Sequence, residues 1–303
     1  MLSSDDVRAA RERLGPVGVW MGSLLGPAPI DQERQAARRI EELGYGSIWT
    51  GEIVGGKEAF AHQSVLLAAT ERILTGTGIA NVWAREPGAM EGGGATLGAA
   101  YPGRFVLGIG VSHGPIIDLS GQTYAHPMKK MVHYLDGMDR AVIYNPSTEV
   151  PVPRVLAALR PKMLGLARDR ADGAHPYLVP PAHTTFAREA LGPDKLLIPE
   201  QAVLLETDPA EARRIARSHL AGYLQLPNYV NNLKRLGYAD DLADGGSDRL
   251  ADAIVAWGTE EDVARRITEH LDNGADHVVL QPLGDIPTAV AQLELLAPVL
   301  LRR

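Results

Sequence analysis

The chain has 303 residues, 45% of them hydrophobic, which is enough to bury a sizeable core in one large domain or two ordinary ones. Its 37 acidic residues outnumber its 30 basic residues, and the resulting formal net charge of −7 argues against a surface for nucleic acid. The absence of cysteine excludes disulfides, thiolate metal sites and cysteine nucleophiles.

The sequence shows no sign of a targeting segment or a membrane span. The stretch from Met1 to Gly15 is charged and helix-like, without the apolar core of a signal peptide. No run reaches the roughly 18 apolar residues that suggest a transmembrane helix. We therefore expect a soluble protein of the cytoplasm that has no membrane partner.

Short apolar strands alternate with helices in the first part of the chain. The expected strands are Val17–Met21, Gly46–Thr50 and Ile73–Ile79. The expected helices are one that Asp31 caps and that ends at Leu43, and one over Ala59–Arg72. Glycines in the third strand indicate a bulge, or a close approach of the backbone, at its end.

The next helix, which follows Trp83–Pro87 and reaches Ala100, has an unusual composition. It contains Gly92–Gly94, and three consecutive glycines would cost an exposed helix about 3 kcal/mol relative to alanine. This helix is therefore either closely packed against another element or broken at the glycines, and the sequence favours neither.

The fourth expected strand, Arg104–Val111, carries the first indication of a functional site. Its apolar run Phe105–Ile109 is typical of a strand buried on both faces. The run ends among glycines, which let a flat ligand approach the backbone, and Ser112 and His113 follow. A binding site and an ordinary strand with a turn both fit this stretch. The loop Ser112–His126 is longer than most connections in compact domains.

The alternation continues to the end of the chain. The remaining expected strands are Arg154–Leu159, His175–Val179, Leu196–Glu206 with an interruption at Pro199, and His277–Gln281. The remaining expected helices are Pro127–Ile143, one opened by Pro161, one whose start is marked by His183, Thr184 and Thr185, one after Asp208–Pro209, Thr259–Leu271 and Ile286–Leu301. The segment Gln225–Trp257 does not fit the alternation and is interpreted as an insertion.

Eight strand-helix units predict an α/β fold, a (β/α)8 TIM barrel with loop insertions, formed as a single domain over residues 1–303 with an insertion around 225–257 before the eighth strand. The alternative is an open doubly wound sheet. The usual phosphate-binding fingerprints of such a sheet, G-x-G-x-x-G and G-x-x-x-x-G-K-[ST], are missing after every expected strand. The barrel is therefore favoured, with its chemistry at the carboxyl ends of the strands.

Three polar residues would meet at the barrel mouth, because Glu52, Asn81 and His113 follow the second, third and fourth strands. A carboxylate and an imidazole across a pocket can act as acid and base. Taken singly, Glu52 could also be solvated and His113 could only satisfy the backbone. Their shared position favours the functional interpretation.

A second candidate is Pro181–Thr185, where backbone N–H groups at a helix start and the hydroxyls of Thr184 and Thr185, with His183 nearby, would suit a phosphate. An ordinary N-cap explains the same threonines. Arg160 and Arg188 could add positive charge to such a site.

Metal binding and serine hydrolase chemistry have little support. The nine histidines form no H-E-x-x-H motif and no His-x-His pair, so a metal site would need ligands assembled wholly by the fold. No G-x-S-x-G elbow is present, and the adjacent Ser112 and His113 are poorly placed to face each other. We expect no metal site.

Four segments in order resemble the bacterial luciferase-like oxidoreductases, particularly the actinobacterial branch that uses the deazaflavin coenzyme F420. The segments are EELGYGSIWTGE (Glu41–Glu52), TGTGIANVWAREP (Thr75–Pro87), YPGRFVLGIGVSH (Tyr101–His113) and RVLAALRPKMLGLA (Arg154–Ala167). The similarity extends from Gly18 to Leu283. It implies a (β/α)8 barrel in which a hydride passes between the cofactor ring and a small organic substrate.

The resemblance also implies roles for individual residues. Catalytic or substrate-facing positions are Glu52 and His113. Positions around the cofactor ring are Gly51, Gly78, Ile79, Ala80, Asn81, Gly110, Val111, Ser112, Ala157, Ala158 and Arg160, with Gly78–Ile79 at a bulge that holds a cis peptide in several members. The phosphate end would lie at Pro181, His183, Thr184 and Thr185.

The chain departs from the sugar-phosphate-oxidising relatives in one respect, because Glu52 and His113 invert their order of imidazole and carboxylate. A sugar-phosphate substrate is therefore not implied. Two alternatives to an F420 enzyme stay open: an FMN-dependent monooxygenase, and a catalytically silent barrel that binds a flavin. The long loops Ser112–His126 and Gln225–Trp257 should set the substrate, and the resemblance suggests a homodimer.

Overall fold

The computed structural model describes residues 1–141 and 144–301, and its parallel strands form a ring. The ring strands are β1 (Val17–Trp20), β2 (Ser47–Thr50), β3 (Leu74–Thr77), β5 (Phe105–Gly110), β6 (Arg154–Leu156), β7 (Gly173–Ala174), β8 (Leu196–Leu197), β9 (Glu200–Leu204) and β11 (Val278–Pro282). The two-residue β4 (Ala80–Asn81) continues β3 and pairs with β5.

The ring closes because β8 and β9 are two parts of one extended segment, interrupted at Ile198–Pro199. β8 pairs with β7, while β9 pairs with β11, which in turn pairs with β1. The interruption falls at Pro199, which has no N–H group and cannot donate a hydrogen bond to a neighbouring strand. Its carbonyl oxygen accepts a hydrogen bond from Val279 N at 3.0 Å. The fold is a (β/α)8 barrel with insertions, as predicted.

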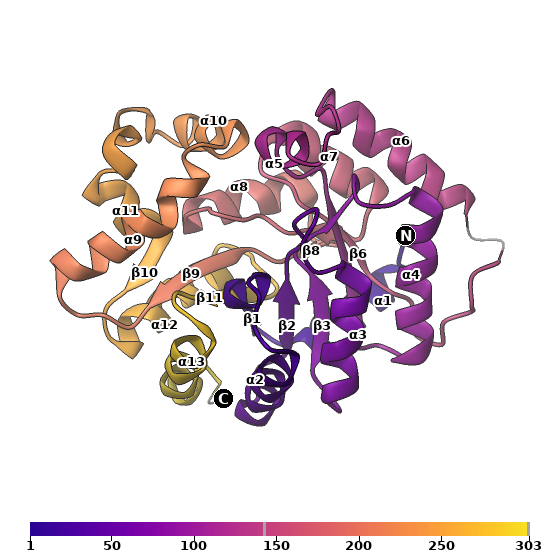
Figure 1. Cartoon of the computed structure of the whole chain (residues 1–303), viewed down its shortest axis with the longest axis horizontal. Coiled ribbons are helices and arrows are strands. Elements are labelled where there is room, and N and C mark those ends of the chain that lie inside the picture. Colours follow the sequence, from indigo (N-terminus) through magenta and orange to yellow (C-terminus); the bar gives the residue numbers. More distant parts are fainter. Residues whose placement is uncertain (142–143, 302–303) are drawn as a thin grey trace.

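Helices surround the ring (Figure 1). They are α2 (Ile30–Leu43), α3 (Ala59–Ala69), α4 (Pro87–Ala100), α6 (Pro127–Arg140), α7 (Pro161–Arg170), α8 (Pro181–Leu191), α9 (Pro209–Tyr223), α12 (Glu260–Asp272) and α13 (Ile286–Leu300). A short α5 (Gly114–Asp118) lies within the loop after β5, and η1 (Gly22–Leu25) follows β1. The Thr259 cap of α12 and the Asp208 cap of α9 are as expected.

The helix α1 (Ser4–Leu14) closes the amino-terminal end of the barrel. Its residues Val7, Ala10 and Leu14 are buried in one cluster with Trp49, Val106, Val155, Ile198 and Val279, which come from different strands of the ring and its Pro199 interruption. The amino end of the barrel is therefore filled by side chains. Inside the ring, a ligand cavity is therefore expected at the opposite, carboxyl end of the strands.

The insertion between α9 and α12 contains α10 (Pro227–Arg235), η3 (Ala239–Asp241), η4 (Ala243–Gly245), α11 (Asp248–Ile254) and β10 (Val255–Trp257). Figure 1 shows α9, α10 and α11 grouped at one side of the barrel. β10 pairs with the outer side of β9 and is not a member of the ring. These elements pack in a separate apolar cluster that includes Leu226, Tyr229 and Leu233.

Several predicted boundaries were wrong. The sixth strand is Gly173–Ala174 and not His175–Val179, because Pro176 and the left-handed Leu178 (φ 57°) prevent a regular ladder there. α3 ends at Ala69 and not Arg72, since the Glu41 carboxylate accepts the backbone N–H groups of the three residues before β3.

Two predicted helix starts were also wrong. Pro29 is the N-cap of α2, and Asp31 lies within its first turn, where it pairs with Arg34 at 2.8 Å. α8 begins at Pro181, so His183, Thr184 and Thr185 lie inside it. α6 ends at Arg140; the last two residues of the helix predicted there, Val142 and Ile143, lie outside the described residues.

The triple glycine lies in an unbroken helix. Of the two alternatives left by the sequence, a broken helix and a closely packed one, the structure therefore shows the closely packed helix. α4 runs through Gly92–Gly94. A Cβ atom at Gly93 would lie 2.6 Å from the Phe60 ring, and one at Gly94 would lie 3.0 Å from Leu107 Cδ2. α4 can approach α3 and β5 this closely only because these positions lack side chains.

Candidate active site

A cavity of about 670 Å³ opens at the carboxyl ends of the barrel strands. The lining residues that end or directly follow a strand are Trp20, Gly51, Gly78, Val111, Ala157 and His175. The insertion adds Leu226, Asn228 and Tyr229 to the lining. Apolar and aromatic side chains dominate this lining, as in most small-molecule sites.

Most of the predicted site residues line this cavity. They are Gly51, Glu52, Gly78, Ile79, Val111, Ser112, His113, Ala157, Ala158 and Arg160. The others do not belong to the lining: Ala80, Asn81 and Gly110 are buried behind it, and Pro181, His183, Thr184 and Thr185 lie in α8.

The cavity floor is formed by the Gly78–Ile79 segment, whose peptide bond is cis, as the resemblance implied. Trp20 Nε1 donates a hydrogen bond to Gly78 O at 3.0 Å. A Cβ atom at Gly78 would overlap Trp20 Nε1 and lie 3.1 Å from His175 Nε2. The missing side chain lets Trp20 and His175, which also line the cavity, pack directly against this backbone.

Glu52 reaches the cavity edge, but its carboxylate is fully engaged. Ala59 N donates to Oε1 at 3.0 Å and Asn81 N donates to Oε2 at 2.7 Å. The Arg85 guanidinium binds both oxygens and completes a forked ion pair. The Glu52 side chain is only 3% exposed. This arrangement fits a carboxylate that fixes the surrounding loops, and not one that exchanges protons with a ligand.

Asn81 is fully buried, with its Oδ1 accepting from Trp83 N at 3.0 Å. Its Nδ2 has no hydrogen-bond partner among the described residues. Asn81 therefore supports the floor from behind, and the expected meeting of Glu52, Asn81 and His113 around one ring is only partly realised.

His113 is the lining residue best suited to move a proton. Its Nδ1 lies 2.8 Å from Asn228 Oδ1, and its ring centre lies 5.0 Å from that of Tyr229. Burial lowers the pKa of His113, and the hydrogen bond to Asn228 partly offsets this. The imidazole is therefore neutral at pH 7.

The backbone before His113 is strained. Ser112 has φ 56°, a left-handed conformation that is rare for residues other than glycine. Tyr124 donates a hydrogen bond from its hydroxyl to Ser112 O at 3.3 Å. This turn places His113 at the cavity wall, and strained residues of this kind are concentrated at functional sites.

Tyrosines form the wall beside His113. Tyr177 shares hydrogen bonds with Tyr223 (2.5 Å between hydroxyls) and with Gln281 Oε1 at 2.6 Å. Glu200 lies in the core nearby, where its Oε2 accepts from Leu178 N at 3.0 Å and its Oε1 has no partner among the described residues. Burial raises the pKa of Glu200 to about 8.

The residues of the predicted phosphate site are engaged elsewhere. His183 Nε2 lies 2.7 Å from Leu159 O, and Thr184 Oγ1 lies 2.7 Å from His270 Nδ1, both in the buried core. Thr185 is exposed on the outer surface of α8. They do not form an anion cradle at the cavity.

The basic side chains that line the cavity lie instead at the start of α7. Arg160, the N-cap of this helix, and Lys162 line the cavity and are exposed. Within the described ranges neither forms an ion pair with an acidic side chain. The pKa of Arg235 is lowered by burial and by the charge of Arg160, which shows that these cations lie near one another.

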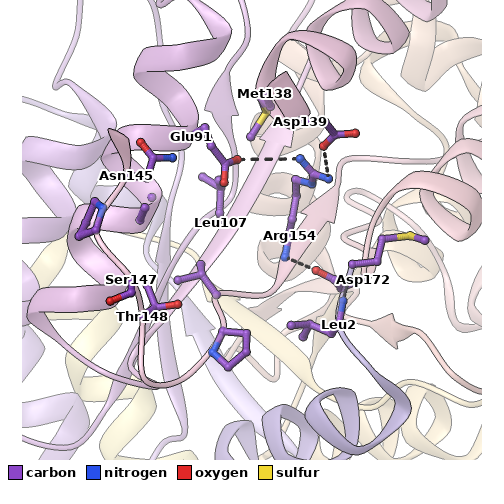
Figure 2. A pocket seen from close by; sticks show the side chains of 16 residues that line it. Leu2, Glu91, Leu107, Met138, Asp139, Asn145, Ser147, Thr148, Arg154 and Asp172 are labelled. Carbon is purple, nitrogen blue, oxygen red and sulfur yellow. Dashed lines mark hydrogen bonds and ion pairs between the residues drawn. The ribbon is translucent and has the colours of Figure 1, made fainter. Parts of the chain in front are cut away.

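A second hollow of about 580 Å³ lies at the amino end of β6 (Figure 2). Figure 2 shows Arg154 between Glu91, at 3.9 Å, and Asp139, at 3.0 Å. Asp172 accepts from the backbone N–H groups of Leu2 and Arg154. The charged groups Arg154, Glu91 and Asp139 are thus paired with one another, while Asn145 Nδ2 in the same lining has no hydrogen-bond partner among the described residues.

The described part of the chain contains neither a candidate metal cluster nor a candidate membrane helix. Among residues 1–141 and 144–301, no three His, Asp or Glu side chains are grouped so that they could hold a metal ion. No helix in the described part of the chain is long and apolar enough to cross a membrane.

The structure is thus a (β/α)8 barrel with a largely apolar cavity at the carboxyl ends of its strands. The sequence model of the luciferase-like monooxygenase family matches residues 14–277. The chain belongs to this family, and hence to the luciferase-like oxidoreductases.

Two curated relatives match across most of the chain. A 5,10-methylenetetrahydromethanopterin reductase of Methanolobus tindarius is 23% identical over 299 residues, which cover 84% of this chain and 92% of the relative. A putative coenzyme F420-dependent oxidoreductase of Mycobacterium tuberculosis is 22% identical over 316 residues, which cover 83% of this chain and 89% of the relative.

Solved structures confirm the fold. An F420-dependent secondary alcohol dehydrogenase, in complex with an F420-acetone adduct, superimposes with a TM-score of 0.75 at 17% identity and covers 95% of this chain and 99% of its own. The oxygenating constituent of a diketocamphane monooxygenase from Pseudomonas putida, in complex with FMN, gives a TM-score of 0.67 at 13% identity, with 94% and 96% covered.

Proposed function

We propose that this protein is an F420-dependent oxidoreductase that transfers a hydride between the deazaflavin ring and a small organic substrate. The observation that carries the proposal is the cavity at the carboxyl ends of the strands, whose largely apolar lining brings Gly78 and Ile79 together with the imidazole of His113. The named F420 dependence of one curated relative supports the choice of cofactor.

The cavity residues fit a bound deazaflavin. Gly51, Gly78 and Ile79 would lie under the ring, with Val111 and Ala157 at its edge. When bound, the cofactor supplies the hydride chemistry, and the protein supplies binding, orientation and proton transfer. Arg160 and Lys162 would hold its phosphate-bearing tail. We propose this position in place of the phosphate site that the sequence predicted in α8.

Residues of the protein would carry out the proton transfer, hold the loops of the cavity in place and exclude water. His113 holds or accepts the substrate proton at Nε2, because Nδ1 is engaged by Asn228. The Glu52–Arg85 pair anchors the loop after β2 to Asn81 and to the start of α3. Trp20 and the tyrosine wall exclude water from the reacting atoms.

The test is to titrate the protein with F420 and, separately, with FMN. Binding is measured by the quenching of cofactor fluorescence. We expect saturable binding of F420. The double variant Arg160→Ala/Lys162→Ala should weaken it about tenfold, an effect that salt reduces. Arg168→Ala, on an exposed turn of the same helix, should leave the affinity unchanged. No saturable response to either cofactor would refute the proposal.

A second candidate is an FMN-dependent monooxygenase. The family's own description and the FMN complex of a structural relative favour it. Preferential binding of FMN in the titration would select this candidate. A third candidate is a non-catalytic barrel that binds a flavin. In that case His113→Ala should leave the cofactor affinity intact, and the wild-type protein should show no turnover.

A further inference from the structure

We infer that Asn228, supplied by the insertion, is a positioning residue that holds His113 as the Nδ1–H tautomer and leaves Nε2 free to accept a proton. The inference rests on the proposed role of His113 in proton transfer. Asn228 lies 115 residues further along the chain and lines the same cavity. It is the one side chain in the described ranges that hydrogen bonds to the His113 ring.

The direction of the hydrogen bond sets the tautomer. The Asn228 amide faces His113 with its oxygen, which can only accept, so Nδ1 must carry the hydrogen. Nε2 then holds the lone pair of a neutral imidazole. No described residue hydrogen bonds to Nε2, which distinguishes His113 from the buried His277, whose Nδ1 pairs with Gly15 O and Nε2 with Ser47 Oγ.

The position of Asn228 is fixed by its neighbours in the first turn of α10. Leu226, the N-cap of the helix, and Tyr229, the residue after Asn228, are both buried in the apolar cluster of the insertion. The Tyr229 ring also packs against His113 and lies 5.4 Å from that of Tyr223. The amide of Asn228 is therefore held at the cavity by packing and not by a flexible loop.

Among residues 1–141 and 144–301, no acidic side chain hydrogen bonds to the His113 ring. The titratable ring in contact with it is that of Tyr229, on α10. The other titratable or charged groups that line the cavity are Glu52, Tyr124, Arg160, Lys162, His175, Tyr177 and Tyr223. Of these, Glu52 is neutralised by Arg85. An uncharged acceptor thus orients His113 without making it a cation at neutral pH.

The test is a pH titration of His113 by nitrogen-15 NMR in the cofactor-free full chain. His113→Gln identifies its signals by their loss. The wild-type spectrum should show Nδ1–H. Asn228→Asp, which is nearly isosteric, should raise the pKa of His113 by about one unit or more, because a carboxylate would face the ring. Asn228→Leu should give a mixture of tautomers.

The matched control is Asn231→Asp, which adds the same charge at an exposed position of α10. It should leave the His113 titration unchanged. Equal shifts in the two aspartate variants, or an unchanged tautomer in Asn228→Leu, would overturn the inference. The measurement needs neither cofactor nor substrate, so a failure of F420 to bind would refute the proposed function without affecting this result.

Discussion

At the scale of single residues, partners outside the cavity decide what the polar side chains can do. Glu52 and His113 both lie at the cavity, but Glu52 is tied to Arg85 and two backbone N–H groups, whereas His113 has one neutral partner. A carboxylate with all its acceptor positions filled is a poor proton carrier, while a neutral imidazole with a free nitrogen is a good one.

Glu52→Gln should therefore affect stability. The amide keeps the shape of the carboxylate but leaves Arg85, whose side chain is 9% exposed, with only the half-exposed Glu58 as a partner. We expect a loss of about 3 kcal/mol in the free energy of unfolding, measured with urea. Glu42→Gln, in the exposed pair with Arg39, should cost less than about 0.5 kcal/mol. Equal stabilities of the two variants would contradict the anchoring role.

Glu200 should make stability depend on pH. Its pKa is raised from 4.5 to about 8 in the folded chain, so it favours folding below about pH 4.5 and loses this contribution as the pH rises toward 8. Glu200→Gln still accepts from Leu178 N but cannot ionise. The stability of the wild type relative to this variant should fall by an amount on the order of 4 kcal/mol between pH 4.5 and 8. A constant difference across that range would show that Glu200 titrates normally.

At the scale of elements, the helix α4 shows how one residue type serves different needs at successive positions. Gly93 faces Phe60, which the Arg85 guanidinium covers at 5.0 Å, so its missing side chain permits the packing. Gly92 faces only Asn145 Oδ1, 3.5 Å from where a Cβ would lie, which is ordinary contact. The two glycines therefore differ in what they contribute to the helix.

The alanine variants at these positions should have opposite effects. Gly92→Ala should stabilise the protein by up to about 1 kcal/mol, because alanine is the better helix former. Gly93→Ala should destabilise it by about 1 to 3 kcal/mol, because its Cβ would push Phe60 from its place. Thermal unfolding of both variants checks this. A gain in stability for Gly93→Ala would mean that Phe60 moves aside at little cost.

At the scale of the whole molecule, the barrel separates a packed end from an open end. α1 fills the amino end, and the cavity occupies the carboxyl end. The separation is typical of (β/α)8 enzymes, in which stability and activity depend on opposite faces. Three statements about the whole molecule stay predictions: that the chain forms one domain, that it pairs as a homodimer, and that it works in the cytoplasm.

Leu14→Ala tests this separation. Leu14 is fully buried in the cluster that joins α1 to the barrel interior, so its truncation should cost about 3 kcal/mol in the free energy of unfolding. The affinity for F420 should be unchanged, because the cavity lies at the other end. Leu119→Ala, at a side chain that is 89% exposed, should alter neither quantity. A matching loss of affinity in Leu14→Ala would show that the two ends are coupled.

The sequence by itself determined the succession of strands and helices, the barrel and most of the cavity floor. Alternation of apolar runs with helical periodicity is a local property, and parallel strands bring their carboxyl ends to one mouth, so Glu52, Asn81 and His113 could be placed there. The family resemblance added Gly78. The strand at His175–Val179 and the helix start at Asp31 were misplaced, because local patterns do not show which N–H groups find partners.

Only the tertiary structure decided the chemical roles. Arg85 binds Glu52 across 33 residues, and Asn228 binds His113 across 115, so neither pairing leaves a signal in local sequence. The raised pKa of Glu200 likewise comes from burial, which depends on the whole packed core. Periodicity is encoded by neighbours along the chain, whereas the charge and protonation of a side chain are set by what surrounds it in space.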